Sequence, residues 1–243
     1  MDRQQFYEIL QQSGVSDYER YLDTHDLFAC QTDFTKLCNQ DELQFQIVHQ
    51  VEELLMKLVV YSILDIDECM QKNQTNQVIT LFKRVHMGQK IILQTLDLLG
   101  TMSPKEYQEI RKKLGNGSGR NSPGFKAILR LFGPLWETYQ THYLKKNNLT
   151  LEQVYDTEFN HTEAYVVAEA LLEFEILFQR FLSQHMQVVN RSIGSDAKSL
   201  KGNDITNLTS RMATRLFPEL WKIRSDMTDR WGKEFGFVRD SLA

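Results

Sequence analysis

The sequence contains few residues that interrupt helices, since only 4 of its 243 residues are proline and 12 are glycine. Apolar residues recur at three- and four-residue spacing along most of the chain, which is the period of a helix that buries one face. The scarcity of breakers and this period together predict helices and not strands. We therefore expect an all-α fold, a helical bundle, and the length fits one domain over residues 1–243 better than two.

The sequence also lacks the features of proteins that bind nucleic acid or membranes. The net charge is −4, and lysine and arginine are spread along the chain instead of being gathered into a basic patch. No apolar run approaches the roughly 18 residues that a membrane-spanning helix needs. Charged residues interrupt Met1–Gly14, where a signal peptide would be apolar. We expect no nucleic-acid partner, no membrane association and a cytoplasmic location.

Cysteine is scarce as well. Cys30, Cys38 and Cys69 are an odd number and form no CxxC pair, which argues against a disulfide framework, a zinc site and a CxxCH cofactor attachment. We expect buried free thiols. The sequence shows no nucleophile elbow, P-loop, dinucleotide fingerprint or paired carboxylates, so hydrolases and nucleotide-dependent enzymes have no support. Redox chemistry would have to come from a bound cofactor.

Stripes of apolar residues place the longest helices. One stripe predicts a helix from about 42 to 70, which is long enough to cross the core, and a second predicts a helix from about 75 to 99. Glycine often ends a helix in the left-handed conformation, so we expect Gly100 to be a left-handed C-terminal cap. A last helical pair is expected around Met212 and Leu220.

Capping residues place two further helices. Ser103–Glu106 has the spacing of a capping box with proline at the first helical position, and its helix should end near Gly115. Thr162 is a typical N-cap residue, and the long apolar stripe after it predicts a helix that Gly194 stops.

Two histidines, His49 and His185, lie inside predicted core helices beside apolar faces. Taken alone, each is more often a core histidine that bonds to an ordinary partner. Helical histidines that face one another across a bundle change this expectation, because bundles build cofactor sites from facing helices and imidazole is the common ligand of haem. Both histidines are therefore candidates for a haem site.

Tyr107 and Arg111 are four residues apart, so they share one face of a helix. The arginine fork matches a carboxylate and could bind an amino acid, although a basic helix end exposed to solvent is the alternative. The stretch Gly115–Gly124, GNGSGRNSPG, is either a plain connector or a loop whose backbone N–H groups donate to an anion or an oxygen ligand.

Several segments resemble the tryptophan 2,3-dioxygenase family. DELQFQIVHQVEEL resembles the family helix that carries a phenylalanine and a distal histidine, which places Phe45 and His49 at those positions. DYERYLDTHDLFACQ resembles the amino-terminal YxxYLxLDxLLxxQ segment. By that resemblance Tyr18, Tyr21 and Leu22 match residues that complete the pocket of a neighbouring subunit.

Three later segments continue the resemblance in family order. MSPKEYQEIRKKLGNGSGRNS resembles the TPxEYxxFRxxLxxxSGFQS stretch, which places Tyr107, Arg111 and Ser118 at substrate-binding positions. HMQVVNRSIG resembles the proximal motif HMxxVxRxIG, so His185 matches the iron ligand. RLFPELWKIR resembles the FPELxxxR string that follows. The segments span most of the chain.

The resemblance implies a homotetramer of helical subunits in which residues 1–30 contact a neighbour. Each subunit would hold non-covalent haem b between core helices, with iron that binds O2, and would convert L-tryptophan to N-formylkynurenine by attack on the indole C2–C3 bond. Arg111 would hold the substrate carboxylate and Phe45 and Tyr107 would line the pocket. His49 would hydrogen-bond the indole N–H or an oxygen intermediate.

Three departures from the family pattern bear on the substrate. KSLKGND replaces the family's glycine-rich GTGGSSG loop, with Ser199 at the threonine that contacts the substrate ammonium. Arg120 replaces the phenylalanine of the SGFQS string. Helices of the family are missing between Phe132 and His161. A site built to hydrogen-bond one group rejects analogues that lack it, whereas an altered loop can accept them.

Two other functions are compatible with these residues. An aromatic monooxygenase of secondary metabolism, acting on tyrosine or a modified indole, would add one oxygen atom to its product where a dioxygenase adds two. A non-catalytic haem-binding helical protein would show a Soret band that no aromatic amino acid changes.

Overall fold

A computed structural model of the chain describes residues 2–11, 16–115, 117–157, 159–195 and 215–231. Over these ranges the chain forms helices and no strand, which confirms the expected all-α fold. The helices in chain order are α1 (Arg3–Gln11), α2 (Asp17–Leu22), α3 (Thr24–Ala29), η1 (Phe34–Lys36), α4 (Asp41–Gln71), α5 (Thr75–Leu99), α6 (Pro104–Leu114), η2 (Gly119–Asn121), α7 (Pro123–Tyr139), η3 (Gln140–Leu144), η4 (Lys145–Asn147), α8 (Leu151–Tyr155), α9 (Glu163–Ile193) and α11 (Pro218–Trp231). Ser199 and Met212 lie outside the described residues.

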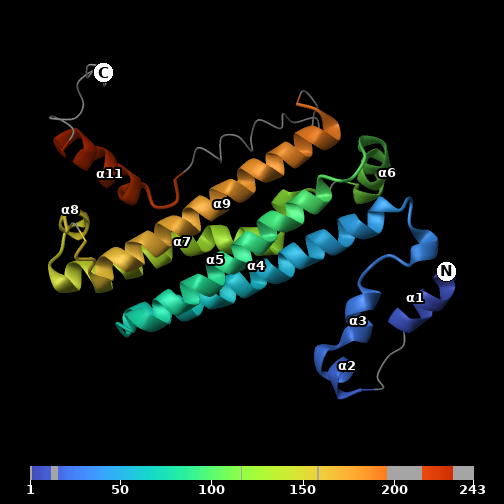
Figure 1. Ribbon diagram of the computed structural model, residues 1–243, viewed down its shortest axis with the longest axis horizontal. Helices are drawn as coiled ribbons and strands as arrows, with labels where there is room; N and C mark the ends of the chain where they lie inside the picture. Colours follow the sequence, from blue (N-terminus) through green and yellow to red (C-terminus); the bar gives the residue numbers. More distant parts are fainter. Residues whose placement is uncertain (1, 12–15, 116, 158, 196–214, 232–243) are drawn as a thin grey trace, which may run out of the picture.

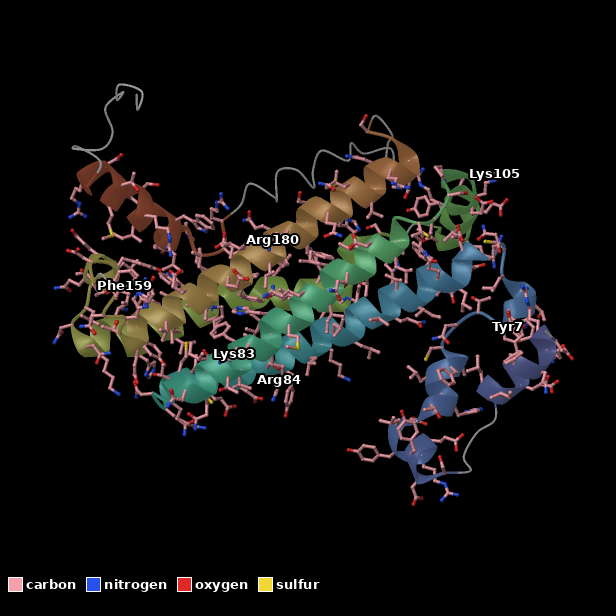
Figure 2. All side chains as sticks on the ribbon, in the orientation of Figure 1. Tyr7, Lys83, Arg84, Lys105, Phe159 and Arg180 are labelled. Carbon is pink, nitrogen blue, oxygen red and sulfur yellow. The ribbon has the colours of Figure 1, made fainter. Side chains whose placement is uncertain are left out.

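Three long helices form the body of the molecule. α5 packs against α4 on one side and α9 on the other, and α7 packs against α4 (Figure 1). Apolar side chains from these helices form one large core, in which the Phe132 ring packs in a tilted contact with Phe174 and an edge contact with Phe178. Charged side chains such as Lys83 and Arg180 stand on the outer faces (Figure 2). The bundle thus buries most of the apolar stripes that the sequence pattern identified, although Ile47, Leu54 and Leu58 of the α4 stripe are exposed.

The ends of the long helices agree with the sequence patterns that predicted them. α9 begins after Thr162, whose hydroxyl accepts the N–H of Tyr165 at 3.2 Å, and it ends at Gly194 with a φ of 84°. This positive φ is the conformation in which glycine has no steric cost, and it stops the helix as predicted.

Gly100 does not adopt the predicted left-handed cap. Its φ is −61° and its ψ is −13°, so the backbone continues the right-handed turn after α5. The next two N–H groups, of Thr101 and Met102, bond to the carbonyls of Leu98 and Leu99 at 3.1 Å each. Glycine is favoured here for space instead, because a Cβ at this position would lie 3.1 Å from the backbone oxygen of Asp97.

The predicted capping box before α6 forms only in half. The Ser103 hydroxyl accepts the N–H of Glu106 at 3.4 Å, as expected. The return bond is replaced, because the Ser103 N–H donates to the Asp41 carboxylate of α4 at 3.3 Å. A tertiary contact has taken the place of a local one.

The stretch between Phe132 and His161 is helical over most of its length. It contains the end of α7, the π-helical turn η3, the short helix η4 and α8. The shortening inferred from the family pattern therefore leaves no long irregular loop in this part of the molecule.

The three cysteines are free thiols, as predicted, but they are not all buried. Cys30 is exposed, and Cys38 and Cys69 are partly buried. Cys30 follows α3 in the N-terminal segment, where Figure 1 shows α1–α3 standing beside the start of α4 and away from the bundle. Among the described helices, none is both long and apolar enough to cross a membrane.

The C-terminal helix α11 is held to the bundle by polar contacts. Arg224 donates to Glu169 of α9 and to the Tyr155 hydroxyl, and its guanidinium lies 4.4 Å from the centre of the Tyr155 ring. The N–H of Phe217 donates to Glu175 at 2.9 Å, which places a buried carboxylate at the N-terminus of α11. A negative charge at this end of a helix is favoured by the helix dipole.

Glu52 should make the stability of the fold depend on pH. It lies on α4 and is 6% exposed, and its carboxyl accepts the Thr95 hydroxyl at 3.1 Å. Burial raises the pKa of Glu52 from its ordinary value of 4.5 to about 7. Because the folded-state pKa is raised, the stabilising contribution of the protonated form is complete below about pH 4.5 and is lost as the pH rises through 7.

We therefore expect Glu52→Gln, which keeps a hydrogen-bonding group but cannot ionise, to be more stable than the wild type at pH 8 by on the order of 2 kcal/mol and to match it near pH 5. Urea unfolding across this pH range measures the difference. Glu68→Gln, at an exposed position on the same helix, is the control. A wild type that gains stability relative to Glu52→Gln with rising pH would contradict the assignment.

Candidate functional site

The predicted site residues gather at one end of the bundle. The first turns of α4 carry Phe45 and His49, α6 carries Tyr107 and Arg111, and the last part of α9 carries His185. α6 packs against both α4 and α9, and Figure 1 shows it beside the N-terminal end of α4 and the C-terminal end of α9. Three separate helices therefore contribute to one site.

An aromatic wall joins α4 to α6. The ring centre of Phe45 lies 4.1 Å from that of His49 and 6.1 Å from that of Tyr107. Burial raises the pKa of the Tyr107 hydroxyl, and the positive charge of Arg111 opposes this shift, so the two side chains lie close together. An apolar, half-buried wall with an adjacent guanidinium suits a ligand that has an aromatic ring and a carboxylate.

His49 is held as a neutral imidazole of known tautomer. Its Nδ1 lies 2.7 Å from the backbone oxygen of Phe45. A carbonyl oxygen can only accept, so Nδ1 carries the proton and Nε2 keeps its lone pair. Burial lowers the pKa of His49, and the Phe45 carbonyl and the Glu53 carboxylate oppose this shift. His49 can thus accept a hydrogen bond from a ligand at neutral pH.

His185 is also a neutral imidazole, but it has no hydrogen-bond partner among the described residues. Burial, with a smaller repulsion from His49, lowers the pKa of His185 to about 4. The repulsion shows that the two imidazoles lie near one another. A neutral imidazole that bonds to no other described group is available as a ligand to a metal.

The loop before α7 approaches His185 through a glycine. A Cβ built on Gly119 would lie 4.0 Å from Nε2 of His185, so a longer side chain here would meet the imidazole. Ser118, which the sequence resemblance placed at the pocket, is exposed. The structure therefore brings the backbone of this loop to His185 and leaves the Ser118 side chain at the surface.

The N-terminal residues do not join the site of their own chain. Tyr18, Tyr21 and Leu22 lie on α2 and are 69%, 89% and 46% exposed. Figure 1 shows α2 at the far end of the N-terminal segment, away from α6 and α9. Ser199 lies outside the described residues, so its predicted place at the site stays a prediction.

Sequence reasoning missed two residues that shape the site. In the sequence, Gly119 stands out only as part of the glycine-rich stretch Gly115–Gly124. The available signal was its Ser118-Gly119 pair, which matches the SG of the family's SGFQS string. Glu53 carries no local signal of its role, yet its carboxylate accepts the N–H of Gly124 at 2.9 Å. This bond ties the first turn of α7, and with it the loop of Gly119, to α4 one turn after His49.

Gly124 fits against α4 only because it has no side chain. A Cβ at this position would lie 2.7 Å from the Cβ of Met56 and 2.8 Å from the Glu53 carboxylate. We expect Gly124→Ala to destabilise the fold by about 1–3 kcal/mol, because neither the α4 backbone nor the buried Met56 can move away cheaply.

Thermal or urea unfolding of Gly124→Ala measures this cost. Gly133→Ala, on the same helix, is the control, because a Cβ there meets open space and stability should change by less than about 1 kcal/mol. Equal effects of the two substitutions would show that the contact between Gly124 and α4 is not tight.

Comparison with known proteins identifies the family. The family model of tryptophan 2,3-dioxygenase matches residues 1–158 of the chain. The tryptophan 2,3-dioxygenase of Myxococcus xanthus is 25% identical over 265 aligned positions, which cover 89% of this chain and 91% of that protein. The enzymes of the same name from Serratia proteamaculans and Bacillus cereus are each 25% identical, with 86% of this chain and 92% of each relative covered. The chain therefore belongs to the tryptophan 2,3-dioxygenase family, whose members are haem-dependent oxygenases.

Proposed function

We propose that this protein is a dioxygenase that binds haem b through His185 and inserts O2 into the indole C2–C3 bond of L-tryptophan or a close indole relative. The observation that carries the proposal is the pair of partly buried, neutral imidazoles that lie near one another on α4 and α9, beside a phenylalanine, a tyrosine and an arginine. The family assignment supports it.

The residues around His185 fit a haem. The imidazole is neutral and has no hydrogen-bond partner in the described part of the chain, and a Cβ built on Gly119 would lie 4.0 Å from its Nε2. The ring of Phe181 lies 5.9 Å away by centroid and adds an apolar neighbour. When bound, haem would supply the oxidising power by activating O2, and the protein would supply orientation and a dry pocket.

His49 would accept the substrate N–H. Its Nδ1 is occupied by the Phe45 carbonyl, so Nε2 is the free acceptor, and the indole N–H is the matching donor. Because burial keeps the pKa of His49 below its ordinary value, the ring stays neutral and can accept this bond at pH 7. Phe45 and Tyr107 would line the indole pocket.

Arg111 would bind the substrate carboxylate. It follows Tyr107 by four residues on α6, and the two side chains lie close together. A guanidinium binds a carboxylate through two parallel hydrogen bonds, which fixes the orientation of the amino acid. We further propose that the hydroxyls of Ser118 and Ser199 assist at the polar end of the substrate.

We also propose that the chain acts as a single domain within a homotetramer, in which α2 of one subunit completes the pocket of another. The exposure of Tyr18, Tyr21 and Leu22 supports this proposal, because three large side chains on one short helix are 46% to 89% exposed. The cytoplasmic location stays a prediction.

A monooxygenase acting on tyrosine or a modified indole is the second candidate. Two departures from the family pattern favour it: KSLKGND replaces the family's glycine-rich loop, and Arg120 replaces an aromatic residue. Mass spectrometry of the product formed from L-tryptophan by the reduced, haem-loaded protein in air decides between the two. A product with two added oxygen atoms supports the dioxygenase, and one added atom supports the alternative. An intact Soret band that no aromatic amino acid changes would contradict both.

The two histidines should respond differently to substitution. We expect His185→Ala to lose haem during gel filtration, because the proposed iron ligand is gone. His49→Ala should keep haem and lose roughly tenfold in turnover, the effect of about one hydrogen bond. Soret absorbance after gel filtration and product formation measure the two effects. Haem and activity retained in His185→Ala would overturn the ligand assignment.

A further inference from the structure

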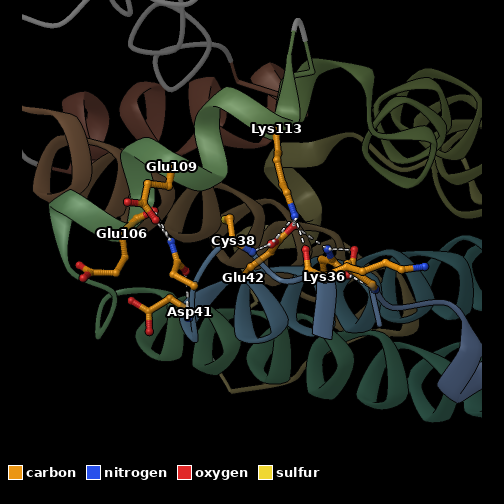
Figure 3. A network of polar contacts seen from close by, with 10 residues as sticks. Lys36, Cys38, Asp41, Glu42, Glu106, Glu109 and Lys113 are labelled. Atoms are coloured by element: carbon orange, nitrogen blue, oxygen red, sulfur yellow. Dashed lines mark hydrogen bonds and ion pairs between the residues drawn. The ribbon is translucent and has the colours of Figure 1, made fainter. Parts of the chain in front are cut away.

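A partly buried ion pair joins α4 to α6 next to the candidate site. The Nζ of Lys113, near the end of α6, lies 2.9 Å and 3.2 Å from the two carboxylate oxygens of Glu42, in the first turn of α4 (Figure 3). The Glu42 side chain is 5% exposed and that of Lys113 is 44% exposed. The carboxylate is therefore hidden from solvent while the ammonium reaches it from the rim.

The same pair also holds the segment that leads into α4. Glu42 accepts the backbone N–H of Cys38 at 2.6 Å, and Lys113 donates to the backbone oxygen of Lys36 at 2.8 Å. Asn39 adds a second attachment, because its side-chain amide donates to the backbone oxygen of Glu106 and to the Glu109 carboxylate, both at 3.0 Å. These contacts are the network drawn in Figure 3.

The contacts divide α6 into two faces. Glu106, Glu109 and Lys113 are spaced by three and four residues, so they share the face that is bound to residues 36–42. Tyr107 and Arg111, spaced by four residues, share a neighbouring face, from which the Tyr107 ring lies 6.1 Å from that of Phe45 between centres. Fixing the first face fixes the rotation of the helix, and with it the direction of the second.

We propose that Lys113 and Glu42 are positioning residues for substrate recognition: their ion pair sets the rotation of α6, so that Arg111 presents its guanidinium to the substrate carboxylate beside Phe45 and His49. This inference rests on the proposed function, in which Arg111 binds that carboxylate. Removing the ammonium leaves a buried carboxylate that only the Cys38 N–H and other neutral groups can satisfy, which favours rearrangement of this end of α6.

The test compares Lys113→Met with Lys112→Met in the full-length, haem-loaded protein. Lys112 is the neighbouring residue, has the same charge and is exposed, and within the described part of the chain its side chain makes no hydrogen bond or ion pair to α4 or to residues 36–42. Calorimetry gives the dissociation constants of L-tryptophan and of tryptamine, which has the same indole and amine but no carboxylate. We expect Lys113→Met to weaken L-tryptophan binding about tenfold, with tryptamine binding within about twofold of the wild type, because only the carboxylate contact is misplaced.

Conservative variants separate positioning from simple loss of stability. Lys113→Arg keeps the ion pair and should restore L-tryptophan binding. Glu42→Gln should weaken it in the same direction as Lys113→Met and should not add to it in the double variant. Lys112→Met should match the wild type for both ligands.

The two binding constants distinguish failure of this inference from failure of the proposed function. If the wild type prefers L-tryptophan to tryptamine and Lys113→Met keeps that preference, the positioning role is wrong and the proposed function stands. If the wild type shows no such preference, the role of Arg111 in the proposed function is wrong. Hydrogen exchange of residues 104–114, followed without any ligand, then decides whether Lys113 orders α6: faster exchange in Lys113→Met than in Lys112→Met supports it, and equal exchange overturns it.

Discussion

The placement of two neutral, partly buried imidazoles near one another, His49 on α4 and His185 on α9, is the constraint on which the site depends. His49 can be buried at little cost because its Nδ1 bonds to the Phe45 carbonyl of its own helix. His185 bonds to no other group among the described residues, and desolvation keeps its imidazole neutral. A neutral imidazole is the form that coordinates iron, which links the surroundings of His185 to the proposed cofactor.

The rest of the site is arranged around these imidazoles by contacts between distant segments. Glu53 holds the first turn of α7, and so the loop that brings Gly119 to His185. The network of Glu42 and Lys113 holds α6 from the opposite side. Each carboxylate lies on α4, at a helical position within about two turns of His49. One long helix therefore carries both a site residue and the groups that position the neighbouring elements.

Local sequence signals predicted the helices well, because caps and apolar periods act over a few residues. Thr162 and Gly194 mark the ends of α9 for this reason. The predictions of helix caps were wrong where a residue distant in the sequence made the hydrogen bond, or where the turn after the helix set the backbone conformation. Asp41 takes the Ser103 N–H from 62 residues away, and the turn after Gly100 keeps that glycine right-handed. The pairing of Glu42 with Lys113 spans 71 residues and has no local signature. Motif resemblance, and not periodicity, supplied the identities of the site residues.

The central claim is that His185 is the ligand of the haem iron, and chemical rescue tests it most directly. His185→Gly leaves a cavity of the size of the lost imidazole, so the variant should bind haem weakly alone and tightly when free imidazole is added. The Soret and electron paramagnetic resonance spectra should then match those of the wild-type holoprotein. Tight haem binding by His185→Gly without imidazole, with a spectrum unchanged when imidazole is added, would contradict the assignment.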